Sequence, residues 1–390
     1  MREEIKKEFV RHFGKTAEAV YAEAPGRTNL IGEHIDYQGG HVLPVAVERV
    51  IGAWAVRRSD RCLRLYSLTY QQLFQGKLEE LTYQRQYPWV NYILGVVEQL
   101  MKREIVSFGF DLAVGGNVPV ASGLSSSAAL EVCIASLLLR MAGTELPPLE
   151  VVRLARRAEN EFVGVNCGIM DQFSSYLCRK GHALLLNCAT LKNRQVPLQL
   201  GQYCFLLVNT LKERSLLSSF YNQRVEQVNA ALATIQKKKP EVRYLAELNV
   251  KELEGFRDCL NSVIFRRALH VVRENERVLK AVDFLQAGQV REFGELLYAS
   301  HESLRDLYEI SCDELDFIVD FSRRSSAVAG ARLTGGGFGG CCLVLLKKEA
   351  VKDFQDSLKQ NYLQRFQREP EFIEVETADG VYYRGNNRRT

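Results

Sequence analysis

The spacing of apolar residues changes along the chain and predicts a mixture of helices and strands. The N-terminal segment places Ile5, Phe9, Val10 and Phe13 at helical spacing, and Gly14 follows as a stop signal, so an amphipathic helix is predicted there. Shorter apolar runs with alternating positions then predict strands. These strands are expected at residues 20–24, 41–48, 51–57 and 62–68.

Helical and strand patterns continue in mixed order to the end of the chain. In the first half, we expect helices at 89–103, 128–143, 149–162 and 169–177, and strands at 109–115 and 182–187. In the second half, we expect long helices at about 216–236, 262–286, 290–300 and 312–321, strands at 203–209, 341–346 and 372–376, and a helix before the closing strand. Because strands and helices do not alternate strictly, the pattern favours the α+β class over a doubly wound sheet.

The length of the chain predicts more than one folding unit. The chain has 390 residues, and a domain usually takes roughly 150, so two or three units are expected. A stretch with polar residues and a proline at 191–201 is the predicted boundary, which divides the chain into two lobes, 1–195 and 196–390. A hydrophobic fraction of 46% is sufficient for a large core.

Composition and charge argue against several classes of function. The net charge of +4 is small, and the basic clusters at Lys237–Lys239, Arg323–Arg324 and Arg388–Arg389 are not interleaved with aromatic residues, so nucleic-acid binding is not expected. The longest apolar run, 128–139, is interrupted by Glu131 and is too short to span a membrane. The charged N-terminal segment lacks the apolar core of a signal peptide.

The cysteines indicate a reducing environment. There are ten, scattered along the chain without a CxxC pair or regular spacing. This distribution is typical of buried, reduced thiols rather than of a disulfide framework or a metal site. We therefore expect a cytoplasmic protein that binds neither nucleic acid nor a membrane.

A loop rich in glycine and serine is the first candidate for chemistry. NVPVASGLSSSAALEVC spans 117–133, and the apolar helix is predicted to begin at Ser127 or Ala128. Such a junction aims free backbone N–H groups and the positive end of the helix dipole at the loop, which favours anion binding. The serine hydroxyls could bond phosphate or Mg²⁺, although a plain serine N-cap is the alternative. The loop lacks the ending of a Walker A motif.

A second glycine-rich segment lies in the C-terminal half. In LTGGGFGGCCLVLL, Gly335, Gly337 and Gly340 match G-x-G-x-x-G, but a strand follows where a dinucleotide site requires a helix. Two interpretations stay open at this point. The backbone could pass very close to a ligand or another loop, or the segment could be a tight hairpin without a catalytic role.

Two acidic residues in the first half could also serve catalysis. Asp171, in CGIMDQFSSYL, lies near a helix start among apolar residues. A buried carboxylate at that position needs a partner, and Arg27 is the partner we nominate, whereas a plain helix N-terminal residue is the alternative. Glu159 could reach a metal ion or could be a solvated helical residue.

The segment APGRTNLIGEHIDYQGG, residues 24–40, groups carboxylates with an imidazole between glycines. Glu33, His34 and Asp36 could grip the hydroxyls of a sugar, because each hydroxyl both donates and accepts hydrogen bonds. The same three side chains could instead bind a metal, or the segment could be a polar loop between strands.

Three of these segments resemble the motifs of a known family. GRTNLIGEHIDYQGGHVLP, PVASGLSSSAALEV and TGGGFGGC are similar to the three motifs of the GHMP small-molecule kinases and, among them, of the branch that phosphorylates galactose. Shorter matches cover most of the chain: WVNYILGV, AENEFVGVNCGIMDQF, RRALHVVRENERV and SHESLRDLYEISCDELD. The resemblance implies an α+β, two-lobed GHMP kinase fold with the active site in the cleft between the lobes.

The resemblance also implies a reaction and roles for individual residues. ATP would phosphorylate D-galactose at its anomeric hydroxyl to give α-D-galactose 1-phosphate and ADP, in galactose catabolism by the Leloir pathway. Asp171 would be the catalytic carboxylate, with Arg27 beside it. The sugar would contact Glu33, His34, Asp36, Gly168 and Tyr221. ATP would contact Gly123, Leu124, Ser125, Ser126, Ser127 and Ala128. Gly335, Gly336 and Gly337 would form a closing loop, and Mg²⁺ would contact Ser127 and Glu159.

The chain departs from the family pattern in two places, which leaves two alternatives. The segment 208–228 lacks the usual basic, histidine-containing approach to Tyr221, and Asn187 stands where the family commonly has an acid. Ile35 also occurs in relatives that prefer N-acetylgalactosamine. The alternatives are a 1-kinase for that or another sugar, and a catalytically silent galactose sensor. The intact serine loop and Asp171 favour catalysis, and we expect a monomer.

Overall fold

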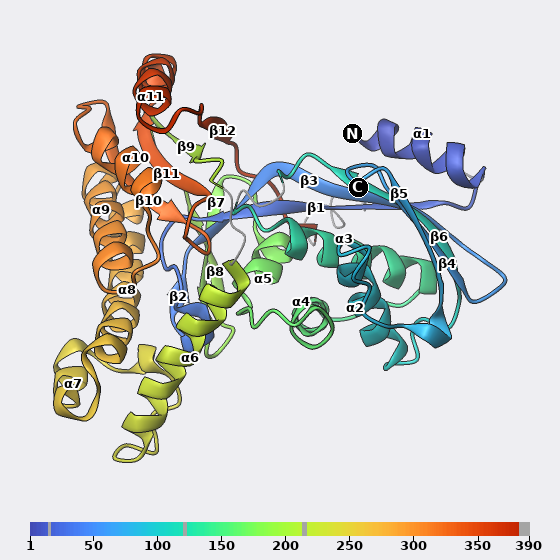
Figure 1. Ribbon diagram of the computed structural model, residues 1–390, viewed down its shortest axis with the longest axis horizontal. Helices are drawn as coiled ribbons and strands as arrows, with labels where there is room; N and C mark the ends of the chain where they lie inside the picture. The colour runs from blue at the N-terminus through green and yellow to red at the C-terminus, as the bar shows by residue number, and fades with distance from the viewer. Residues whose placement is uncertain (15–16, 120–122, 213–216, 382–390) are drawn as a thin grey trace.

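A computed structural model describes residues 1–14, 17–119, 123–212 and 217–381 of the chain. Part of the predicted phosphate loop, residues 120–122, and the predicted basic cluster Arg388–Arg389 lie outside these ranges. Figure 1 shows an elongated molecule with sheets and helices at both ends, so the α+β class predicted from the pattern is confirmed.

A five-stranded sheet forms one end of the molecule. Its order is β1 (Val20–Asn29), β3 (Pro44–Arg57), β6 (Phe110–Gly116), β4 (Cys62–Ser67) and β5 (Gln72–Lys77), and only β4 and β6 run parallel. Helix α1 (Arg2–Phe13) covers one face, while α2 (Val90–Met101) and α3 (Ser126–Ala142) cover the other (Figure 1). Alternating strand residues therefore face two separate apolar clusters.

Several predicted boundaries in this half were wrong. Val10 is 42% exposed, so the buried stripe of α1 consists of Ile5, Phe9 and Phe13. The strand predicted at 20–24 continues through Pro25 to Asn29, because a proline is tolerated where the pairing register shifts. The runs 41–48 and 51–57 form the short β2 (His41–Val42) and one long strand, β3.

Helices α4 (Pro148–Arg157) and α5 (Met170–Leu177) lie beside α3 and are joined by an irregular segment. The single helix predicted at 149–162 was wrong in its second part, because residues Ala158–Val163 form a π-helix. A π-helix has wider turns than an α-helix and is often found at functional sites. It ends at Gly164, which has a φ of 86°.

A four-stranded antiparallel sheet forms the other end. Its order is β10 (Val328–Thr334), β11 (Cys341–Lys347), β9 (Tyr203–Asn209) and β12 (Glu371–Val375). Helices α9 (Val290–Asp306) and α10 (Asp313–Arg323) pack on β10, α8 (Ser262–Gln286) packs on α9, and α11 (Val351–Phe366) packs on α10 (Figure 1). Strands β5 and β10 were not predicted from the sequence.

A small sheet lies between the two ends. It contains β2, β7 (His182–Asn187) and β8 (Asn193–Pro197), so the linker predicted at 191–201 contains a strand. Helices α6 (Leu217–Gln236) and α7 (Val250–Glu254) follow. Short 3-10 turns complete the described elements: Asp36–Gln38, Leu78–Glu80, Leu245–Glu247, Arg257–Cys259 and Lys348–Ala350. Within the described ranges, no helix has both the length and the apolar character needed to cross a membrane.

The backbones of α9 and β10 touch directly, and this contact sets the path of the strand that leads into the glycine-rich segment. A Cβ placed on Gly294 would lie 2.1 Å from the carbonyl oxygen of Ala329, and a Cβ on Gly330 would lie 2.3 Å from that of Gly294. Both neighbours are backbone atoms, so no side chain can rotate away to make room.

We expect Gly294→Ala to lower the free energy of unfolding by about 1–3 kcal/mol, because an added methyl group overpacks this contact. Chemical denaturation measures the change. Gly255→Ala is the matched control, because Gly255 has a φ of −62° and its Cβ would meet nothing closer than 3.3 Å. If the free energy of unfolding falls by less than about 0.5 kcal/mol in both variants, the usual range for surface substitutions, the backbone contact does not require glycine at position 294.

Candidate active site

Arg27 is presented at an irregularity in strand β1. The pairing of β1 with β3 shifts register between Pro25 and Arg27, and such bulges change the direction of a side chain. The backbone N–H of Arg27 donates to the carbonyl of Leu124 at 3.0 Å, and Nη1 donates to that of Gly123 at 2.6 Å. The arginine is therefore tied to the predicted phosphate loop by both main chain and side chain.

The predicted pairing of Arg27 with Asp171 is present in the structure. Nε and Nη2 of Arg27 donate to the two carboxylate oxygens of Asp171, each at 2.7 Å, which is the strong, bidentate form of this contact. Arg27 is 5% exposed. Burial alone would lower the pKa of its guanidinium, but Asp171 and then Glu33 raise that pKa above its ordinary value.

Ser125 joins the phosphate loop to this pair. Its hydroxyl donates to Oδ2 of Asp171 at 2.5 Å. It stands at the N-cap position of α3 with a φ of 52° and makes no capping hydrogen bond. The plain N-cap interpretation is therefore wrong for Ser125, and helix α3 begins one residue earlier than predicted, at Ser126. The hydroxyl of Ser125 therefore bonds to the carboxylate of Asp171 and does not cap helix α3.

Glu159 lies in the π-helix and is 6% exposed. The side chains of Gln172, at 2.6 Å, and Cys167, at 3.3 Å, donate to its Oε2 atom, and Ser127 also hydrogen-bonds to the carboxylate. Burial, and then the nearby charge of Asp171, raises the pKa of Glu159 to about 6. The interpretation as a solvated helical residue is excluded, and the predicted metal pair Ser127 and Glu159 lies together.

A second buried acid was not identified from the sequence. Glu131 of α3 is fully buried and accepts from the amide nitrogen of Gln172 at 3.0 Å. Burial, and then repulsion by Glu159, raises the pKa of Glu131 well above its ordinary value. The interruption of an apolar run by a glutamate was the signal available in the sequence, but it does not indicate a partner.

Asp36 and Gly168, which were both predicted to contact the sugar, face each other. Burial, and then the charge of Asp171, raises the pKa of Asp36 to about 6. Oδ2 of Asp36 accepts from the backbone N–H of Met170 at 3.5 Å. A Cβ on Gly168 would lie 1.7 Å from Oδ2 of Asp36, so no side chain fits at that position while the carboxylate is there. A cavity of about 450 Å³, also bordered by Arg156, adjoins these two residues.

An aromatic cluster forms the adjacent wall. Nδ1 of His34 lies 2.7 Å from the hydroxyl of Tyr37, which lies 2.8 Å from that of Tyr308. The ring centroid of Tyr221, in α6, is 5.1 Å from that of His34. Burial lowers the pKa of His34 to about 4, so its imidazole is neutral. Tyr37 and Tyr308 were not among the predicted site residues, although both lie in segments that carry the resemblance.

The glycine-rich segment contacts both the phosphate loop and residues 24–40, which are called the sugar segment below. A Cβ on Gly335 would lie 3.3 Å from Cα of Gly123, and the carbonyl of Gly336 is 3.3 Å from Nε2 of His34. The close-approach interpretation of this segment therefore agrees with the structure. Gly337 instead packs against Ile310.

Not every predicted residue offers a free side chain. The carboxylate of Glu33 already contacts Asn29, Thr334 and Gly335. Ala128 is fully buried in α3, so its side chain is closed to a ligand from solvent. Asn187, where the family has an acid, accepts from the backbone N–H groups of Ala189 and Thr190 and so shapes a turn.

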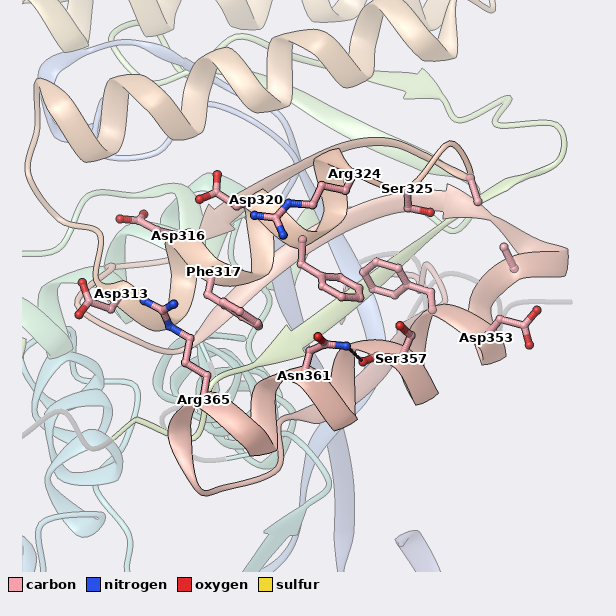
Figure 2. Close-up of a pocket in the computed structure, with 14 residues that line it drawn as sticks. Asp313, Asp316, Phe317, Asp320, Arg324, Ser325, Asp353, Ser357, Asn361 and Arg365 are labelled. Carbon is pink, nitrogen blue, oxygen red and sulfur yellow. Dashed lines mark hydrogen bonds between the residues drawn. The ribbon is translucent and has the colours of Figure 1, made fainter.

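Another groove, of about 650 Å³, lies between α10 and α11 (Figure 2). Its rim carries Asp313, Asp316, Asp320 and Asp353, and Phe317 projects into it. None of the residues predicted for the site lines this groove. The residues predicted for catalysis and binding therefore lie where the phosphate loop, the sugar segment and the glycine-rich segment meet, and not in this groove.

Three family models match the chain. The galactokinase galactose-binding signature matches residues 7–56, the GHMP kinases N terminal domain matches residues 91–179, and the GHMP kinases C terminal model matches residues 281–364. Their order along the chain agrees with the order of the motifs described above.

Curated relatives match over nearly the whole chain. A galactokinase of Clostridium tetani is 40% identical over 381 residues, covering 97% of each chain. A galactokinase of Thermotoga maritima is 42% identical over 359 residues, covering 92% of this chain and 98% of the relative.

Solved structures agree with these relatives. A crystal structure of Lactococcus lactis galactokinase complexed with galactose superposes with a TM-score of 0.94 at 36% identity, covering 97% of this chain and 98% of that one. Methanococcus jannaschii mevalonate kinase, at 19% identity, has a TM-score of 0.67 over 94% of this chain and 100% of its own, and so shares the fold. The GHMP kinase fold and the sugar phosphotransferase class predicted from the motifs are confirmed. The chain belongs to the galactokinase family of the GHMP kinases.

Proposed function

We propose that this chain transfers the γ-phosphoryl group of ATP to the anomeric hydroxyl of D-galactose and releases α-D-galactose 1-phosphate and ADP. The observation that carries this proposal is the contact of one carboxylate, Asp171, with both Arg27 and the phosphate-loop residue Ser125. A base and a phosphate-binding loop in direct contact suit phosphoryl transfer to a hydroxyl, because this reaction depends mainly on positioning and charge stabilisation.

In the proposed mechanism, Asp171 orients the sugar hydroxyl and accepts its proton. Its side chain is 26% exposed, whereas that of Arg27 is 6% exposed, so the carboxylate presents the accessible surface of the pair. Arg27 favours the ionised carboxylate and offsets negative charge on the transferring group. Ser125 holds Oδ2 of Asp171 in place.

The phosphate loop, Gly123 to Ala128, would hold ATP through backbone N–H groups at the start of α3, with the positive end of the helix dipole. Ser127 and Glu159 would hold Mg²⁺. Both offer oxygen ligands, and Mg²⁺ is commonly held by one or two carboxylates together with substrate phosphates, so this pair fits the ion. Bound there, Mg²⁺ would neutralise phosphate charge. The orientation of Glu159 comes from its hydrogen bonds with Gln172 and Cys167.

Asp36, Gly168, His34 and Tyr221 would contact the sugar. Asp36 supplies acceptors for hydroxyl groups, and Gly168 has no side chain that would displace that carboxylate. Both ring nitrogens of His34 already lie within hydrogen-bond distance of Tyr37 and the carbonyl of Gly336, so the sugar would contact the face of its neutral ring. Glu33 stands behind this wall and does not reach the sugar in this scheme, because its carboxylate is 2% exposed and is held by Asn29, Thr334 and Gly335.

We also keep three broader expectations as proposals. A lobe boundary just after β8 (Asn193–Pro197), close to the predicted residue 195, is supported by the five-stranded sheet, which lies wholly before it, and by β9, which begins after it at Tyr203. A cytoplasmic location is supported by ten free thiols, all of them in the described ranges. The monomer expected from the sequence also stays a proposal.

Release of ADP by the purified protein tests the function over galactose, N-acetylgalactosamine, galacturonate, arabinose and glucose. We expect turnover to be fastest with galactose. Faster turnover with N-acetylgalactosamine would identify the alternative 1-kinase. Thermal stabilisation by galactose without ADP release from any of the sugars would identify a sensor and contradict the proposal.

Asp171→Asn should lower kcat by about 10³-fold, within the range for loss of a general base, because an amide cannot accept the proton. Steady-state ADP release gives kcat, and calorimetry should show that the variant still binds galactose. Asp313→Asn, on the exposed rim of the groove in Figure 2, is the control for the same chemical change. A folded Asp171→Asn protein with near-normal turnover would remove Asp171 from the mechanism.

Asp36→Ala should raise the KM for the sugar by about 10–100-fold, because it removes hydrogen bonds to a charged acceptor, each worth about 1.5–3 kcal/mol. The KM for ATP should change by less than about threefold. Initial rates with each substrate varied in turn measure both values. Equal increases in the two KM values would show that Asp36 does not act on the sugar alone.

A further inference from the structure

Arg332, in strand β10, is a fully buried cation that no step above uses. Its Nη1 atom donates to the carbonyls of Asn29 at 3.0 Å and Leu30 at 2.8 Å, where β1 ends. Its Nη2 atom lies 3.0 Å from Oε1 of Glu33. A buried guanidinium is costly unless it is paired, and Glu33 is the counter-charge within ion-pair distance among the described residues.

Glu33 connects this cation to the glycine-rich segment. Its side chain is 2% exposed. Oε1 accepts from the backbone N–H of Gly335 at 2.6 Å and lies 2.9 Å from the hydroxyl of Thr334, while Oε2 accepts from the amide of Asn29. Arg332 therefore forms an ion pair with the carboxylate that receives the N–H of Gly335, three residues further along the chain.

Gly335 is the point at which three segments meet. It has a φ of 82°, and its Cβ position is 3.3 Å from Cα of Gly123. The carbonyl of Gly123 accepts from Arg27, the partner of Asp171. A displacement of Gly335 would therefore reach the phosphate loop and the Arg27 contact, although Arg332 itself touches neither of them directly.

We propose that Arg332 is a positioning residue for the transfer reaction: by holding Glu33, it places Gly335 against the phosphate loop. This inference rests on the function proposed above. Arg332 contacts neither sugar nor ATP in this scheme. It acts on the rate of transfer through the glycine-rich segment, not through the affinity of the sugar.

Arg332→Met tests the proposal. We expect kcat to fall at least tenfold, with the KM for galactose within threefold of the original value. The variant removes the ion-pair partner of the buried Glu33, so its Tm should fall as well. Arg64→Met is the control for loss of a guanidinium far from the site: Arg64 pairs with the buried Asp111 in the five-stranded sheet, where Arg58 also contacts that carboxylate. The control should change Tm without changing kcat.

The double variant Arg332→Met with Glu33→Gln separates stability from positioning. It removes the uncompensated charge, so Tm should recover in part, but kcat should stay at least tenfold below that of the unaltered protein. Recovery of kcat together with Tm would show a merely structural role and overturn the proposal. A folded Arg332→Met protein with kcat within twofold of normal would also overturn it.

Hydrogen exchange examines the same segment without relying on turnover. In Arg332→Met, the amide of Gly335 should exchange at least tenfold faster, because its acceptor Glu33 is no longer held. Unchanged exchange would overturn the proposal. If the unaltered protein releases no ADP but exchange at Gly335 increases in the variant, the proposed function fails while the positioning of the segment stands.

Discussion

The bidentate pair of Arg27 and Asp171 is the interaction on which the arrangement of this site depends. It joins the end of β1 to the start of α5, and the remaining donor of Arg27 and the hydroxyl of Ser125 bring in the phosphate loop. In the chain, Arg27 lies 96 residues from Gly123 and 144 residues from Asp171. A single ion pair can position them because its planar, double contact fixes orientation as well as distance.

The site holds more buried acid than buried base. Asp36, Glu131 and Glu159 have raised pKa values, chiefly because each is removed from water, and Asp171 adds repulsion to all three. Gln172 separates two of these acids by donating to both Glu131 and Glu159. Burial and mutual repulsion therefore favour the protonated forms of these acids, and a cation bound beside Glu159, as proposed above, would favour its ionised form.

Much of this arrangement could be predicted from the sequence, because local patterns and motif spacing carry it. The helix after the serine loop, the strands around the motifs and the pairing of Arg27 with Asp171 were predicted. The π-helix at Glu159 was not, because its residues have the same apolar spacing as an ordinary helix. Glu131, Gln172 and Arg332 were missed for another reason: their roles come from partners remote in sequence, and single residues give no sign of such contacts.

The last described residues of the chain run back along the first half of the molecule. Val47 bridges Thr377, the backbone N–H of Ala378 donates to the carbonyl of Ala46, and that of Gly380 donates to Cys178. The N-terminal half therefore cannot complete its backbone hydrogen bonds while it is being synthesised. These contacts can form only after residues 377–380 have been synthesised, so the C-terminal segment contributes the last backbone partners of the N-terminal half.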